Sequence, residues 1–192
     1  EIGVRLVGSE MCIRDRFLLM TGLYENINAI QDEKNLTFLY RAPKLEMKSL
    51  NIGAVAQKYA DTFDIDSDGA VEMAKLTKGY PFAFQVLGYL TWNNNGDYKG
   101  VLAEYRQYLE EYVYEKIWSE LSSKDKEIAF AIAQCETGKI KDIRELLHID
   151  TNQFNPYRKR LIKKGIVDGS EYGFVRFTLP FFEQFVIENY YD

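Results

Sequence analysis

Residues 165–180 read GIVDGSEYGFVRFTLP, and this stretch decides the fold predicted for the C-terminal part of the chain. Ile166 and Val167 are typical of a buried strand, and residues 168–171 have the composition of a turn. Residues 172–179 then return with apolar side chains at every second position, which is the period of a strand. The stretch therefore predicts a two-stranded ribbon.

The residues before the ribbon predict three amphipathic helices. Ser122 or Ser123 is expected to cap the first helix, because a side-chain hydroxyl can accept a hydrogen bond from a free backbone N–H. The third helix occupies part of residues 151–164. Proline is disfavoured beyond the first helical turn, so Pro156 predicts that this helix begins properly only near Asn155.

Pro180 follows the ribbon and is expected to open a last amphipathic helix. Three helices, a two-stranded ribbon and a closing helix are the elements of a winged helix, which is a variant of the helix-turn-helix. Residues 122–192 are therefore expected to form a winged-helix domain. His148, the only histidine, lies between the second and third helices and is interpreted as a turn residue rather than a catalytic base.

The third helix of this domain is rich in basic residues, and in a helix-turn-helix this element enters the major groove of DNA. The side chains expected to contact bases or phosphates are Asn152, Asn155, Arg158, Lys159 and Lys163 on the helix and Arg176 on the ribbon. Residues 122–192 nevertheless contain 11 basic and 11 acidic residues, whereas a domain that reads DNA usually has an excess of positive charge. Duplex DNA and a protein partner both remain candidate ligands of this surface.

A sharp corner between two helices is predicted at residues 77–90, which read TKGYPFAFQVLGYL. Gly79 can adopt the left-handed conformation that ends a helix, and Pro81 fits the first turn of the next one. Helices expected over residues 51–63, 70–77, 81–92 and 99–121 place this corner inside a helical subdomain that spans residues 51–121.

Residues 64–69, DIDSDG, match the beginning of a calcium-binding loop. Such a loop needs a bidentate glutamate at its twelfth position, and here that position is Lys75. No metal site is therefore expected. The stretch is interpreted as a turn in which Ser67 or Asp68 caps the following helix.

Two short apolar segments, residues 17–20 and 36–47, are typical of strands. Residues 6–15, LVGSEMCIRD, instead resemble the translation of a sequencing-library adapter over ten consecutive positions. Residues 1–16 are therefore interpreted as a non-native head. On this interpretation the gene sequence begins inside a larger protein.

The composition suits one large domain or two small ones, because the chain has 192 residues, of which 46% are hydrophobic. A net charge of −5 gives no general attraction to nucleic acid or to an anionic membrane. No apolar run reaches the roughly 18 residues typical of a spanning helix, and the N-terminus has no secretory pattern. Cys12 and Cys135 form neither a disulfide framework nor a metal pattern. A cytoplasmic location without membrane contact is expected.

The order of these segments resembles the C-terminal half of an AAA+ type ATPase, in particular of the origin-recognition-like and STAND branches. FLLMTGLYENI at residues 17–27 resembles the sensor 1 strand and the segment after it, and TFLYRAPKLEMKSL at residues 37–50 resembles the stretch that holds the last core strand. KGYP at residues 78–81 resembles the Gly-X-Pro motif of the helical lid. The resemblance implies a mainly α fold: a remnant of the AAA+ α/β core at residues 17–50, the lid, and the C-terminal winged helix.

The same resemblance assigns roles to individual residues. Thr21 would sense the γ-phosphate or orient the attacking water, and Arg41 stands near the position of an arginine finger, so both are candidate catalytic residues. Gly79, Tyr80 and Pro81 would lie against the adenine and sugar. ATP and magnesium are the cofactors that the resemblance implies for the full-length parent.

The chain departs from the family pattern, because its sequence contains neither the phosphate-binding loop G-x-x-x-x-G-K-[ST] nor an acidic Walker B strand. The usual sensor 2 arginine is not evident in residues 81–88, which favours the STAND-like form. This chain alone is therefore expected neither to hydrolyse ATP nor to bind it tightly.

The expected function is a nucleotide-dependent switch, in which the lid and the winged helix control binding to DNA or to a protein. The first alternative is a free-standing winged-helix regulator that binds DNA or docks proteins without ATPase activity. The second alternative is a helical scaffold for protein assembly.

Overall fold

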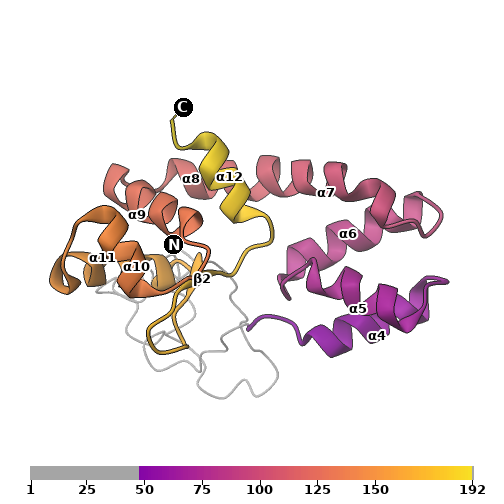
Figure 1. Cartoon of the computed structure of the whole chain (residues 1–192). Helices are drawn as coiled ribbons and strands as arrows, with labels where there is room; N and C mark the ends of the chain where they lie inside the picture. Colours follow the sequence, from indigo (N-terminus) through magenta and orange to yellow (C-terminus); the bar gives the residue numbers. More distant parts are fainter. Residues whose placement is uncertain (1–47, 192) are drawn as a thin grey trace, which may run out of the picture. The chain divides into compact units, whose positions relative to one another are not determined.

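The computed structural model describes residues 48–191, and these residues are mainly helical, as the sequence predicts (Figure 1). Contacts between Cα atoms place Lys48–Asp192 in one compact unit, so residues 51–121 and 122–191 pack together. The strands expected in residues 17–47, with Thr21 and Arg41, lie outside the described residues, as does the head at residues 1–16.

Two short helices, α4 (Ile52–Thr62) and α5 (Ser67–Lys75), begin at side-chain caps. The carboxamide of Asn51 accepts a hydrogen bond from the Ala54 N–H at 3.0 Å. The cap of α5 is Asp66, whose Oδ1 accepts from the Gly69 N–H at 2.7 Å, so the prediction of Ser67 or Asp68 as the cap is wrong. Asp66 has the extended backbone that a cap needs, whereas the next two residues are already helical.

The predicted corner follows α5, and its geometry confirms the roles expected for its glycine and proline. Gly79 has φ +74°, and Pro81 is the first residue of α6 (Pro81–Asn93). The Leu50 N–H donates to the Gly79 carbonyl at 2.8 Å, and an added Cβ at Gly79 would lie 2.5 Å from the Leu50 carbonyl oxygen. Glycine is therefore required both by the backbone angle and by the close approach of the chain.

The long helix predicted over residues 99–121 is present, but it contains a π-helical turn. Its parts are η1 (Lys99–Val101), α7 (Leu102–Leu109), the π-helical η2 (Glu110–Tyr114) and α8 (Glu115–Ser119). A π turn adds one residue to the helix and shifts the phase of every side chain after it. After this turn Tyr114 and Trp118 are buried, whereas Val113 and Ile117 are only partly buried against the same core.

The C-terminal elements are α9 (Ser123–Gln134), α10 (Ile140–Leu147), α11 (Thr151–Lys163), β1 (Val167–Asp168), β2 (Arg176–Phe177) and α12 (Phe182–Asn189). Ser122 is the N-cap of α9, as one of the two expected alternatives. The strands pair antiparallel, with Val167 opposite Phe177 and Asp168 opposite Arg176. The return strand predicted over residues 172–179 is therefore shorter than expected.

The predicted start of α11 near Asn155 is wrong, because the helix begins at Thr151. Asp150 and Gln153 form a capping box, in which each side chain accepts a hydrogen bond from the backbone N–H of the other residue. These two bonds satisfy N–H groups at the helix start and hold it in place although Pro156 lies inside the helix. His148, before this start, is the left-handed residue that ends α10, as expected for a turn.

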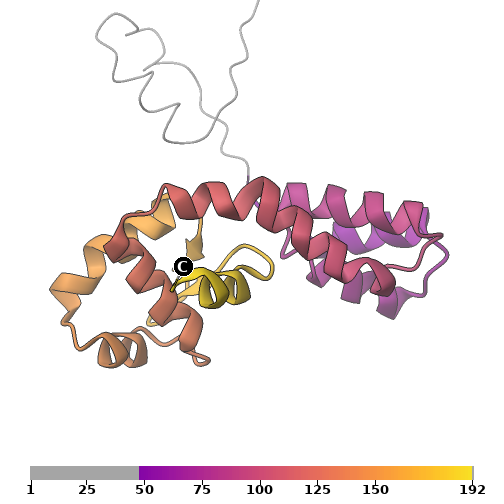
Figure 2. The same ribbon diagram turned by 90° about the horizontal axis from the view of Figure 1, so that it is seen from above.

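Figure 2 shows α12 lying beside the long helix, and an aromatic cluster joins α12 to this helix and to the ribbon. The ring of Tyr114 meets the ring of Phe182 edge to face at 5.0 Å, and Phe182 in turn packs on Phe177 and Phe185. The Tyr114 hydroxyl donates to the Pro180 carbonyl inside this cluster. None of the helices within residues 48–191 is both long and apolar enough to cross a membrane.

Candidate nucleic-acid interface

The basic helix α11 is anchored by one apolar face and exposes the other. Phe154 and Leu161 are fully buried, and the helix packs on α9 and β1. Of the predicted contact residues, Asn152, Lys159 and Lys163 are exposed, and Asn155 is half-buried. The structure therefore brings the predicted polar residues of α11 to its outer surface, with one exception.

That exception is Arg158, which holds the ribbon. Its Nη2 donates to the Gly169 carbonyl at 3.0 Å, and its Nε is buried with no hydrogen-bond partner among the described residues. The guanidinium thereby fixes the turn between β1 and β2 against α11. Arg158 acts inside the fold, and its charge is only partly available to a ligand.

A second arginine of the same helix is also used internally, which the sequence pattern did not indicate. Arg160 Nη1 lies 3.3 Å from Oδ2 of Asp125, a carboxylate in the first turn of α9 that is only 2% exposed. Ser122 Oγ donates to the same oxygen at 2.6 Å, whereas Oδ1 of Asp125 is buried with no hydrogen-bond partner in the described part of the chain. The guanidinium of Arg160 also lies over the ring of Tyr157, at 5.1 Å from its centroid. Arg160 therefore positions α11 on α9.

The ribbon contributes charge of both signs to this side of the molecule. Arg176 is exposed and lies over the ring of Phe174, at 5.8 Å from its centroid. Asp168 accepts hydrogen bonds from the backbone N–H of Ser170 at 2.9 Å and from its hydroxyl at 2.8 Å. These bonds stabilise the ionised carboxylate and lower the pKa of Asp168 below its ordinary value of 3.8.

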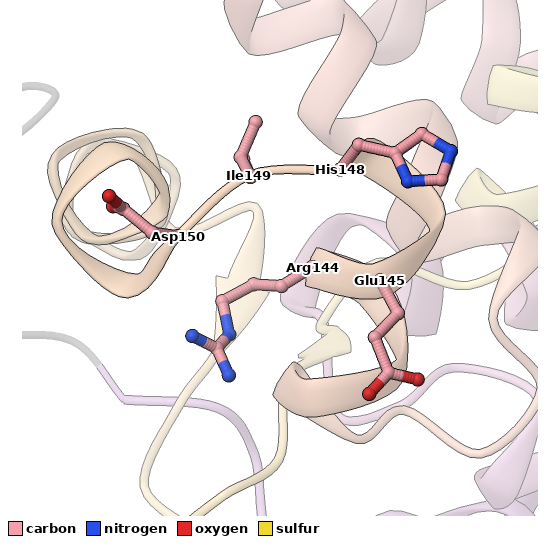
Figure 3. A pocket seen from close by; sticks show the side chains of 5 residues that line it. All are labelled: Arg144, Glu145, His148, Ile149 and Asp150. Atoms are coloured by element: carbon pink, nitrogen blue, oxygen red, sulfur yellow. The ribbon is translucent and has the colours of Figure 1, made fainter.

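A hollow of about 500 Å³ lies at the turn between α10 and α11, where Arg144, Glu145, His148, Ile149 and Asp150 line it (Figure 3). Figure 3 shows these side chains pointing in different directions rather than toward one shared centre. The Arg144 guanidinium donates to the hydroxyl of Thr151 and thereby braces the turn. Without convergent polar groups, the hollow does not have the form of a small-molecule or catalytic site.

The corner predicted to contact a nucleotide is packed against the C-terminal elements. Gly79 is buried, Tyr80 is half-buried, and Pro81 is exposed. Burial raises the pKa of the Tyr80 phenol. Lys78 has a left-handed backbone, and its Nζ donates to the Phe177 carbonyl at 3.3 Å and pairs with Glu183 at 3.3 Å.

These contacts test whether the described residues fit ATP. The ring of Tyr80 packs against that of Phe82, with 6.4 Å between their centroids, and Pro81 is exposed. The cation beside them is Lys78, and its ammonium group is committed to the ribbon and to α12. The described residues around the corner therefore do not form a phosphate site.

A family model matches part of the chain. The model of a family described as a domain of unknown function, DUF8462, matches residues 111–186. The matched segment begins in the π-helical turn η2 and ends inside α12. No match was found among the curated proteins or among the solved structures.

Proposed function

We propose that residues 122–192 form a winged helix that binds duplex DNA through the outer face of α11. The observation that carries this proposal is the charge of the helix, because residues 151–164 contain five basic residues and no acidic residue. Lys159 and Lys163 are exposed on the same side as Asn152. Lysine contacts phosphates and asparagine pairs with adenine in the major groove, so these residue types suit a duplex.

The ribbon supports the same surface. Arg176 lies on β2, which follows the turn that Arg158 ties to α11. A basic residue there suits a phosphate contact beside the groove that the helix occupies. The internal use of Arg158 and Arg160 gives α11 a fixed orientation, and a fixed orientation lowers the entropic cost of placing side chains on a ligand.

Protein docking is the second candidate function of this domain. It is favoured by the neutral charge balance of residues 122–192 and by the two arginines whose charges are used inside the fold. On this alternative, α11 and the ribbon contact a protein, and Lys159 and Lys163 lie at the rim of the interface.

Residues 51–121 are proposed to be the helical lid of a nucleotide-dependent switch of the AAA+ or STAND kind. Lys78 contacts β2 and α12, and this contact supports the proposal because it joins the corner, where the base site is proposed, to the domain proposed to bind DNA. The phosphate-binding residues, ATP and magnesium are proposed for a longer parent protein. The alternative is a free-standing regulator without ATPase activity.

The DNA proposal is tested by titrating a fluorescent duplex with the full 192-residue chain and recording anisotropy at several salt concentrations. If about three phosphates are contacted, the affinity falls roughly 40-fold between about 50 mM and 200 mM salt. Lys159→Gln removes one contact and lowers the slope of log affinity against log salt by about 1. Lys58→Gln, an equal change of charge at an exposed position of α4, leaves the slope unchanged.

Two results decide against DNA. Either no binding is detected at about 50 mM salt, or Lys58→Gln weakens binding as much as Lys159→Gln does. Both results leave protein docking as the function of the surface.

A further inference from the structure

Helices α6 and α7 with the π turn η2 expose a group of tyrosines and glutamates, Tyr89, Tyr108, Tyr112, Glu104 and Glu111, which we call the tyrosine–glutamate face. Tyr89 is 59% exposed and Tyr112 is 66% exposed. The rings of Tyr108 and Tyr112 stack at 5.5 Å between centroids. Large aromatic side chains that are ordered but exposed are enriched in protein interfaces.

The carboxylates belong to the same group as the rings. Partial desolvation raises the pKa of Tyr108, and the nearby Glu104 carboxylate, the phenols of Tyr89 and Tyr112, and Glu111 raise it further. Within residues 48–191, no basic side chain forms an ion pair with Glu104 or Glu111. The face therefore combines apolar area with negative charge that nothing in the described part of the chain neutralises.

A ligand for this face must be cationic, and the chain itself contains a surface of that kind. Residues 151–164 contain no acidic residue, and although Arg158 and Arg160 are bound inside the fold, Lys159 and Lys163 are exposed on α11. In Figures 1 and 2, α11 and the pair of helices α6 and α7 lie at opposite ends of residues 48–191. The two surfaces belong to one compact unit and cannot meet within one molecule.

We propose that the tyrosine–glutamate face binds the basic helix α11 of a second copy of this chain. Because the two surfaces are different, the association is head-to-tail, and the pair keeps one surface of each kind free for further copies. Ammonium groups lie over the tyrosine rings and beside the carboxylates, and the tyrosines supply the apolar area that exposed ion pairs lack.

The contact covers the surface that is proposed for DNA, so duplex and second copy compete for α11. This consequence rests on the proposed function, whereas the self-association does not. In the absence of DNA, α11 is bound to the tyrosine–glutamate face of a second copy, and added duplex displaces that copy.

The test is sedimentation of the full chain without DNA at about 50 mM salt, where screening of exposed charges is weak. The mean mass is expected to rise with concentration above the 22.4 kDa of one chain and to fall when salt is added. Glu111→Lys and Lys159→Glu each weaken association about tenfold or more, because each places like charges opposite one another. The double variant Glu111→Lys with Lys159→Glu restores it by exchanging the two charges.

Two further variants keep the test independent of folding. Glu136→Lys makes the same change of charge at an exposed residue after α9 and leaves association unchanged. Tyr112→Ala, which has no charge effect, weakens it. A chain that is monomeric at every concentration, or a double variant no better than either single variant, overturns the proposal.

Failure of the self-association proposal can be told apart from failure of the DNA proposal. Glu111 lies outside α11, so at protein concentrations where the wild type is monomeric Glu111→Lys leaves the affinity for duplex DNA unchanged, while at higher concentrations it reduces self-association. Loss of DNA binding in the wild type together with intact self-association refutes the proposed function alone. The reverse outcome refutes this inference alone.

Discussion

Removing the guanidinium of Arg160 should destabilise the protein, although Arg160 lies on the basic surface of α11. Arg160 is 45% exposed, but its partner Asp125 is 2% exposed and has one carboxylate oxygen with no hydrogen bond from any residue within 48–191. Arg160→Ala leaves only the Ser122 hydroxyl to stabilise that carboxylate. The change should therefore cost stability rather than merely remove a surface charge.

The expected loss of stability follows from the different burial of the Arg160 and Asp125 side chains. Breaking a fully buried ion pair costs about 3–5 kcal/mol, and exposed pairs are worth about 0–1 kcal/mol. Since solvent reaches Arg160 but not Asp125, we expect a loss of about 1–2 kcal/mol in the free energy of unfolding. Lys159→Ala, the adjacent exposed cation, should change it by less than about 0.5 kcal/mol.

The assay is urea unfolding of the full chain for the wild type, Arg160→Ala, Asp125→Asn and the double variant. The double-mutant cycle should give a coupling energy of about 1 kcal/mol between the two side chains. A coupling energy within error of zero, or an Arg160→Ala loss no larger than that of Lys159→Ala, would refute the reasoning.

Three further predictions concern other parts of the fold. Tyr114→Phe leaves the buried Pro180 carbonyl without its donor and should cost about 1–2 kcal/mol in urea unfolding, whereas Tyr112→Phe at an exposed position should cost nothing measurable. Gly79→Ala should lower the free energy of unfolding by about 2–3 kcal/mol, because it adds a clash with Leu50 to a left-handed backbone. Gly96 is also left-handed but lies in open space, so Gly96→Ala should cost only about 1 kcal/mol. Equal losses for the two variants would contradict the packing of the corner. The lowered pKa of Asp168 means that its contribution to stability is complete above pH 3.8 and is lost as the pH falls through the lower pKa of the folded state. The free energy of unfolding of Asp168→Asn should therefore fall less on acidification than that of the wild type. Parallel curves of stability against pH for the two proteins would disprove the turn geometry.

The local structure could largely be predicted from the sequence, because caps, breakers and apolar periods act over a few residues. Gly79 and Pro81 define the corner, and Ser122 caps α9, through backbone geometry that neighbouring residues determine. The position of Pro156 gave a wrong helix start, because a capping box at Asp150 and Gln153 outweighs one lost backbone hydrogen bond.

The packing could not be predicted in the same way, because its partners are far apart in the chain. The period of the long helix gives no sign of the π turn, which moves Tyr114 to a partner 66 residues away at Pro180. Lys78 meets the Phe177 carbonyl 99 residues away. Such contacts depend on the tertiary fold rather than on local composition.

The candidate site was predicted in part. The outer face of α11 carries Asn152, Lys159 and Lys163, as the helical spacing indicates. Charge alone did not distinguish these residues from Arg158 and Arg160, whose guanidinium groups bind Gly169 and Asp125. Whether a basic side chain turns inward depends on an acceptor inside the fold that binds it, and a single sequence does not show where such an acceptor lies.

The claim at the centre of this account is that the outer face of α11 binds duplex DNA. It is tested most directly by the salt dependence of duplex affinity in the full chain, compared between the wild type and Lys159→Gln. The account predicts a steep negative slope for the wild type and a slope reduced by about 1 for the variant. A wild-type affinity that does not change with salt, or identical slopes for the two proteins, would contradict it.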